Sequence, residues 1–208
     1  MSFVKSFWGA ICFSLSLSVS LLAFLPNADE SQLIFPFVVT AEDIRDLSNS
    51  PPGATYEIGH KLYVTLVYDM DGRVRNLVQS DLDRLGITVG TAHQFALDNL
   101  TVLAESDQII KRLVQGPNQM PMMIWGGHWL TSSCMLLPKM NSWFKQELKS
   151  ESILLNIPQR DMLMMFPNNS KNAYLEIQRF VRQNNDKFLD TISLRLFEIT
   201  DQGLDPFY

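Results

Sequence analysis

Cysteine is scarce in this chain: only two of its 208 residues, Cys12 and Cys134, carry a thiol. Cys12 belongs to an apolar segment at the N-terminus, so the roughly 180 residues after that segment hold one cysteine and cannot form an internal disulfide. A chain of that length buries roughly 70% of its unfolded surface and needs no covalent cross-link. We therefore expect one domain that is held together by a hydrophobic core.

Clusters of basic residues are missing as well. The chain has 17 Lys and Arg against 22 Asp and Glu, which gives a net charge of −5, and its bases are interspersed with acids. Phosphate backbones and anionic lipid surfaces are bound by concentrated basic faces. We therefore expect neither nucleic acid nor an anionic membrane surface as a partner.

The sequence also lacks the common signatures of nucleotide, metal and serine-nucleophile chemistry. It contains no Gly-x-x-x-x-Gly-Lys, Gly-x-Gly-x-x-Gly or Gly-x-Ser-x-Gly motif. The histidines, His60, His93 and His128, are scattered, and their spacing gives no support for a zinc site with Cys134. We expect no cofactor and no bound metal.

Charge is absent from residues 6–25, which form an apolar run between Lys5 and Pro26. A short basic start and such a run are typical of an export signal or a membrane anchor, since a helix of this length rises about 30 Å. Four interleaved serines favour cleavage near Ala28, while retention as an anchor stays open. We predict that residues 1–28 are a signal peptide or membrane anchor. The protein is then exported across the cytoplasmic membrane, as a periplasmic or extracellular protein, or anchored to that membrane by the uncleaved run.

Residues 29–60 are predicted to be an N-terminal extension with a short helix and a proline-rich loop. Thr40 and Asp43 have the spacing of a capping box, which predicts a helix through Leu47. Adjacent prolines within residues 48–53 then predict a loop, because they cannot continue a helix.

A strand and two helices are predicted next. Residues 61–68 are rich in β-branched and aromatic side chains and predict a strand, which a tight turn joins to residues 73–79 as a hairpin. A second capping box begins at Ser80 and predicts a short helix that ends at Gly86. Thr88 begins a longer helix.

Residues 61–208 as a whole are predicted to form an α+β domain. Further strands are expected at 109–115, 120–125, 153–157, 162–166 and about 194–199, and helices at 143–148 and about 170–184. Short connections between neighbouring strands favour antiparallel pairing. The predicted fold is a mixed, largely antiparallel sheet with helices packed on one face, in a single domain that follows the N-terminal apolar segment.

Three stretches of the chain resemble a known family. They are LYVTLVYDMDGRVRNLVQSDLDRLGITVGTAHQFALDNL from Leu62 to Leu100, the pair Gly126-Gly127 with the serines after it, and Ile157-Pro158-Gln159-Arg160-Asp161. Over about residues 60–200 the chain is similar to the YtpQ family of bacterial domains of unknown function. The resemblance implies a fold and a bacterial origin and brings no established reaction. Such proteins are generally thought of as soluble and cytoplasmic, so the apolar N-terminal run is a departure from the family.

Two residues have the spacing of a nucleophile and its base. Cys134 and His128 are six positions apart, so on a strand both side chains would face the same side. On a helix they would lie about 240° apart. No local protease signature surrounds the cysteine. The alternative is that Cys134 is a small buried hydrophobe and His128 a residue at the rim of a core.

Arg160 and Asp161 are candidates for ligand binding, because a guanidinium after a proline turn can hold a carboxylate or phosphate at two points. The alternative is structural: Arg160 pairs with an acid of residues 80–98 and joins two elements. His93 and Asn99, on different faces of the predicted long helix, are two further binding candidates.

Three functions from different classes follow from these observations. The first, which we favour, is an exported or envelope-associated binding or interaction module without catalysis, with a protein partner in the cell envelope. The second is a small hydrolase or transferase that uses Cys134 with His128. The third is a membrane-anchored accessory subunit of an envelope complex.

Overall fold

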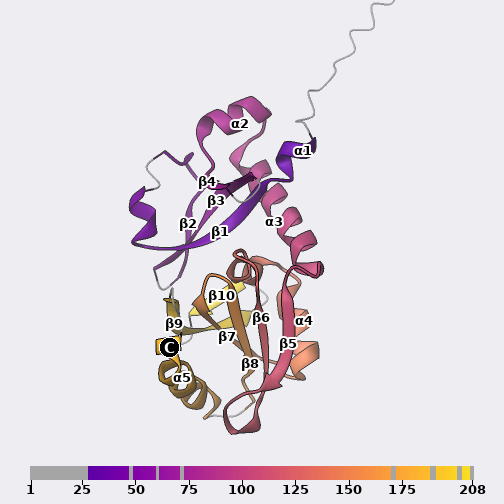
Figure 1. The fold of residues 1–208 in the computed structure, drawn as a ribbon, viewed down its shortest axis with the longest axis vertical. Helices are drawn as coiled ribbons and strands as arrows, with labels where there is room; N and C mark the ends of the chain where they lie inside the picture. The colour runs from indigo at the N-terminus through magenta and orange to yellow at the C-terminus, as the bar shows by residue number, and fades with distance from the viewer. Residues whose placement is uncertain are drawn as a thin grey trace, which may run out of the picture.

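The computed structural model describes residues 28–46, 49–59, 61–70, 73–169, 172–187, 191–200 and 203–206. The predicted signal or anchor run, residues 6–25, lies outside these residues, as does His60. Strands of the described residues form two sheets, one of four strands and one of six (Figure 1). Every pair of neighbouring strands in these sheets is antiparallel, and helices pack around both. The predicted α+β fold class is confirmed.

The first sheet is built around β3 (Leu62–Met70), the strand predicted from its β-branched and aromatic residues. One side of β3 pairs with the whole length of β1 (Ile34–Thr40). The other side pairs with β2 (Tyr56–Gly59) at one end and with β4 (Arg73–Asn76) at the other. β3 and β4 are the predicted hairpin.

Two helices cover this sheet. They are α2 (Gln79–Leu85), which ends at Gly86 as predicted, and α3 (Val89–Glu105), which begins after the predicted cap Thr88. Leu82 of α2 and the alanines on the apolar stripe of α3 pack on Leu66 and Tyr68 of β3. The second half of α3 continues past this sheet, and its Leu100 and Leu103 enter the core of the second one.

The second sheet has the strand order β10-β9-β7-β8-β6-β5. Its strands are β5 (Ile110–Gln115), β6 (Pro121–Gly126), β7 (Ile153–Gln159), β8 (Met162–Pro167), β9 (Thr191–Thr200) and β10 (Gly203–Pro206). The elements between them are η2 (Pro117–Gln119), η3 (Ser132–Leu136), α4 (Met140–Leu148), α5 (Ala173–Gln183) and η4 (Asn185–Lys187), while α1 (Ala28–Ser31) and η1 (Asp43–Asp46) flank β1.

Helices lie on both faces of this second sheet, whereas the sequence predicts one sheet with helices on one face. Leu163 and Met165 of β8 pack toward the core that contains α4, and the alternate residues Met164 and Phe166 pack under α5. Both faces of the sheet must be covered by helices, because the central strands carry continuous apolar runs whose side chains point alternately to the two faces. Residues 29–60, predicted as an extension, contribute β1 and β2 to the first sheet.

The two predicted capping boxes have different outcomes. The Thr40 N–H donates to Asp43 Oδ2 at 2.8 Å and the Asp43 N–H donates to Thr40 Oγ1 at 3.4 Å, so this box is confirmed and opens η1. The box at Ser80 is wrong. The helix is capped by Val78, whose N–H donates to Asp81 Oδ2 at 3.0 Å.

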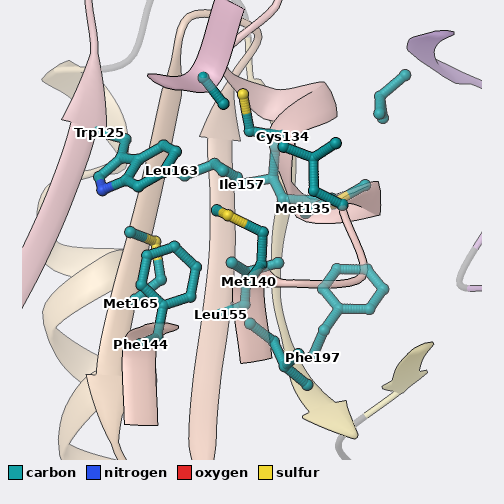
Figure 2. Close-up of a cluster of buried hydrophobic side chains, with 14 of the residues drawn as sticks. Trp125, Cys134, Met135, Met140, Phe144, Leu155, Ile157, Leu163, Met165 and Phe197 are labelled. Carbon is teal, nitrogen blue, oxygen red and sulfur yellow. The ribbon is translucent and has the colours of Figure 1, made fainter. Parts of the chain in front are cut away.

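A shared core joins the two sheets. Val38, Leu62 and Val64 of the first sheet belong to the same cluster of buried side chains as Leu155 and Leu163 of the second. Figure 2 shows the part of this cluster between the second sheet, η3 and α4, where the rings of Trp125 and Phe144 meet edge to face. None of the helices in the described residues is long and apolar enough to span a lipid bilayer.

Candidate functional site

Cys134 lies in η3 and not on a strand, so its spacing from His128 does not place the two side chains on a common face. β6 ends at Gly126, and the chain turns at Gly127 with φ at +92°, a conformation that favours glycine. The Cys134 thiol donates to the Leu130 carbonyl at 3.8 Å, and His128 Nδ1 accepts the Leu130 N–H at 3.2 Å. Among the described residues no hydrogen bond joins the cysteine to the histidine.

Burial opposes reactivity at Cys134. Its side chain has no exposed surface and lies in the shared core (Figure 2), and burial raises the pKa of the thiol to about 12, opposed by a smaller effect of Lys111. The thiolate is the nucleophilic form, so almost none exists at neutral pH. Partial burial also lowers the pKa of His128, and Asp69 opposes this with a smaller effect. The lower pKa favours the neutral ring, whose Nδ1 accepts the Leu130 N–H. These contacts favour structural roles for both residues.

Arg160 joins the two sheets. It lies in the turn between β7 and β8 of the second sheet, and its guanidinium donates to the Val38 carbonyl of β1 at 3.0 Å and to Asp43 Oδ2 at 2.9 Å. It also lies over the Phe37 ring, 5.0 Å from the centroid. The structural alternative is therefore supported, with Asp43 as the acid instead of one from residues 80–98.

The strand register explains why the Val38 carbonyl needs this partner. The Asp69 N–H donates to the Leu33 carbonyl at 2.8 Å. In this register the backbone N–H and C=O groups of odd-numbered β1 residues bond to β3, and those of even-numbered residues point away from β3. Val38 is even, and Arg160 donates to its outward carbonyl. The Asp43 carboxylate, beside the Arg160 guanidinium, is held in its ionised form. Burial raises the pKa of Asp43, but hydrogen bonds from Thr40 and from Arg160 outweigh burial and leave the pKa below its ordinary value.

The other predicted binding residues also hold the fold. The Asn99 side-chain amide donates to the carbonyls of Ser31 and Ile34, at 2.7 and 2.9 Å, and ties α3 to the chain before β1. His93 Nε2 lies 3.0 Å from the Gly53 carbonyl oxygen. Asp161 is exposed at the β7–β8 turn, where it accepts a hydrogen bond from Gln159 at 2.7 Å. The structure does not bring Asn99, His93 and Asp161 into one site.

A hollow of about 530 Å³ lies where the two sheets meet. β2 of the first sheet and β10 of the second lie against each other at this point. The walls of the hollow come from both sheets, α3 and the segment from η3 to α4, and polar and apolar atoms contribute nearly equal parts of their surface; the apolar residues include Ile58, Leu97, Met135, Leu137, Ile199 and Leu204. This volume lies within the range of small-molecule sites, which often form at junctions between structural units.

The polar residues of the hollow are few. Glu57, Tyr56, Asn141 and Thr200 line it beside the apolar residues, and Glu57 accepts the Lys61 N–H at 3.3 Å. Sequence patterns could not have located this hollow, because its lining comes from six elements that only the fold brings together. The strand β2, which supplies Tyr56 and Glu57, has four residues and no alternation of buried and exposed positions.

In the part of the chain that the structure describes, no group of three or more His, Cys, Asp or Glu side chains is placed to hold a metal ion. Comparison with known proteins adds no relative: no family model, curated protein or solved structure matches the chain.

Proposed function

We propose that this chain is a non-catalytic binding module that works in the cell envelope after export. The observation that carries the binding role is the hollow between the two sheets, since its walls combine apolar side chains with polar groups and its volume of about 530 Å³ suits a small molecule. Its occupant would be a small amphipathic molecule with an apolar body and a head that donates hydrogen bonds. The apolar body would lie against Ile58, Leu97 and Met135, and the head would face the Glu57 carboxylate.

The other candidate residues have structural contacts, so the proposed binding role rests on the hollow and not on them. Arg160 and Asn99 hold separate parts of the chain together through hydrogen bonds to backbone carbonyls. The second candidate function, a hydrolase or transferase, requires a reactive thiolate at Cys134, and burial of this thiol argues against it.

A pocket-filling substitution on α3 tests the binding role. Leu97→Trp places a large ring in the hollow, and Val102→Trp, at a position 71% exposed on the same helix, is its matched control. The probe is Nile red, a neutral dye whose emission rises in apolar sites. We expect emission with the wild type and the control, and at least a fivefold loss with Leu97→Trp.

A second variant distinguishes blocking of the hollow from misfolding of Leu97→Trp. Leu204→Arg enters the hollow from β10, on its opposite wall, and should lower Nile red emission in the same way. Equal emission from the wild type and both pocket variants, each with a cooperative thermal transition, would remove the hollow as a binding site.

The proposed location depends on residues 6–25, and the resemblance to the YtpQ family remains part of the proposal. N-terminal sequencing of the native protein, after separation of membrane and soluble fractions, tests the location. A new start near Asp29 would support an exported soluble module, and an intact N-terminus in the membrane fraction would support the third candidate, an anchored accessory subunit. An intact N-terminus in the cytosol would contradict both.

A further inference from the structure

The strand β5 forms one end of the second sheet and, among the strands that the structure describes, pairs only with β6. Its register shows which backbone groups face outward. The Gly116 N–H donates to the Met120 carbonyl at 2.7 Å, so residues of β5 with even numbers exchange hydrogen bonds with β6. Pro121, which has no N–H, stands opposite the odd-numbered Gln115. This agrees with the register, because the backbone groups of this pair make no hydrogen bond between β5 and β6. The N–H and C=O groups of Lys111, Leu113 and Gln115 therefore point away from the sheet.

The side chains of the same three residues lie on the face that α4 covers. Lys111 stands opposite Trp125 and Leu113 opposite Met123, and both partners belong to the core on that face. Leu113 is 59% exposed, although it is a leucine on a sheet. An added strand would cover this side chain and pair with its backbone at the same time.

A groove lies on this face between β5 and α4, which runs beside it in Figure 1. Its volume is about 480 Å³, and it is lined by Glu105, Lys111, Lys139, Ser142, Trp143 and Gln146. Two of these side chains are cationic and one is anionic. Arg112 adds a third cation on the opposite face of β5. The edge is therefore locally basic in a chain with a net charge of −5.

Lysines on edge strands often prevent pairing with other chains by projecting over the free edge. Lys111 is folded inward instead. Its ammonium lies 4.9 Å from the ring centroid of Trp125 and 5.0 Å from that of Trp143, in two cation–π contacts. The edge beside Lys111 is left open, while its charge lines the groove.

We propose that β5 is a docking edge for an extended, acidic segment of a protein partner. The segment would pair in antiparallel register with Lys111, Leu113 and Gln115 through the backbone. An Asp or Glu side chain on its α4 face would enter the groove between Lys111 and Lys139, and an apolar side chain two positions away, on the same face, would cover Leu113. Backbone pairing gives such complexes affinity, and pockets for alternate side chains give them specificity. This site is separate from the hollow between the sheets.

Labelled peptides test the proposal. The probe is a fluorescein-labelled, amidated hexapeptide with glutamate, valine and glutamate at positions 1, 3 and 5, which share one face of a strand, and threonine between them; its counterpart has lysine in place of glutamate. Fluorescence anisotropy should show binding of the acidic peptide and at least tenfold weaker binding of the basic one. Equal binding of the two would overturn the proposal. Leu97→Trp should leave binding unchanged, which keeps a failure at the hollow distinct from a failure at this edge.

Two variants separate backbone pairing from charge. Leu113→Pro removes an N–H that points outward, so β5 and β6 stay paired, while Leu113→Thr keeps that N–H as its control. Lys139→Glu reverses one charge of the groove without touching the strand, and Lys149→Glu, exposed just after the other end of α4, is its control. Both test variants should weaken binding at least tenfold and both controls less than threefold. Wild-type affinity in Leu113→Pro or in Lys139→Glu would overturn the proposal.

Hydrogen exchange gives an independent measurement. On addition of the acidic peptide, the amides of Lys111, Leu113 and Gln115 should exchange more slowly, while those of Arg112 and Val114, which already face β6, should not change. Unchanged exchange at the first three would contradict the proposal. So would a wild-type dimer in sedimentation that Leu113→Pro dissociates, because the edge would then be an interface between two copies of this chain.

Discussion

Arg160 and Asp43 are separated by 117 positions in the sequence, and their side chains meet at 2.9 Å where the two sheets join. The same guanidinium donates to the Val38 carbonyl on the free edge of β1. One side chain of the second sheet thereby completes the hydrogen bonding of an edge strand in the first. We infer that this contact fixes the relative position of the sheets, and with it the shape of the hollow between them.

Replacing Arg160 should weaken the fold. Arg160→Ala leaves the Val38 carbonyl and the Asp43 carboxylate without this donor, and we expect a loss of about 1–2 kcal/mol in the free energy of unfolding. Urea denaturation followed by circular dichroism measures it. Arg179→Ala on the exposed side of α5 is the control and should change stability by less than about 0.5 kcal/mol. An equal effect of both substitutions would contradict the bracing role.

Cys134 should react slowly with alkylating reagents. Burial raises the pKa of its thiol to about 12, so at pH 8 both access and ionisation oppose the reaction. We expect iodoacetamide to label the native protein at Cys134 at least about 100-fold more slowly than the urea-unfolded protein. Mass spectrometry of the peptide that contains Cys134 measures both rates. Labelling of the native protein at the unfolded rate would restore the hydrolase hypothesis.

His128 should make the fold sensitive to mild acid. Its pKa is lowered by burial, so between pH 7 and 5 the unfolded chain takes up a proton more readily than the folded one. Stability is therefore complete above about pH 6.5 and falls as the pH is lowered through the folded pKa. His128→Gln should flatten the dependence of the urea midpoint on pH in this range. An unchanged slope in His128→Gln would exclude this source of acid sensitivity.

Local patterns predicted those elements in which local and tertiary preferences agree. β3 was predicted from its β-branched residues and α3 from its cap at Thr88 and its apolar stripe. β1 was missed because Pro36 interrupts its apolar run and argues against a strand. The structure accommodates the proline at an even position of β1, where the missing N–H faces away from β3.

The candidate site was harder to predict than the fold. The structural alternative for Arg160 came from residue chemistry alone, but its partner did not, because Asp43 comes close only when two sheets pack together. Cys134 and His128 were paired on the assumption of a strand, and the chain after Gly127 forms η3 instead. Spacing along a chain predicts a shared face only when the secondary structure is known.

Asp81 combines two roles at the start of α2, and its replacement should be costly. It caps the helix by accepting the Val78 N–H, and it accepts two hydrogen bonds from Arg75, at 2.6 and 2.7 Å. Asp81→Asn removes the charge and should lower the free energy of unfolding at pH 7 by about 1–3 kcal/mol. The neighbouring Asp83→Asn, at an exposed position, is the control and should cost less than about 0.5 kcal/mol.

The effect of Asp81→Asn should also depend on pH. The hydrogen bonds from Arg75, opposed by burial and aided by the Val78 N–H, lower the pKa of Asp81, so the unfolded chain takes up a proton at higher pH than the folded one. The stabilisation is therefore complete above about pH 4 and is lost as the pH falls through the folded pKa. Urea midpoints of wild type and variant should differ at pH 7 and converge toward pH 2. A difference that stays constant over this range would show that the cost does not come from the charge of Asp81, because the carboxylate of the wild type titrates here and the amide of the variant does not.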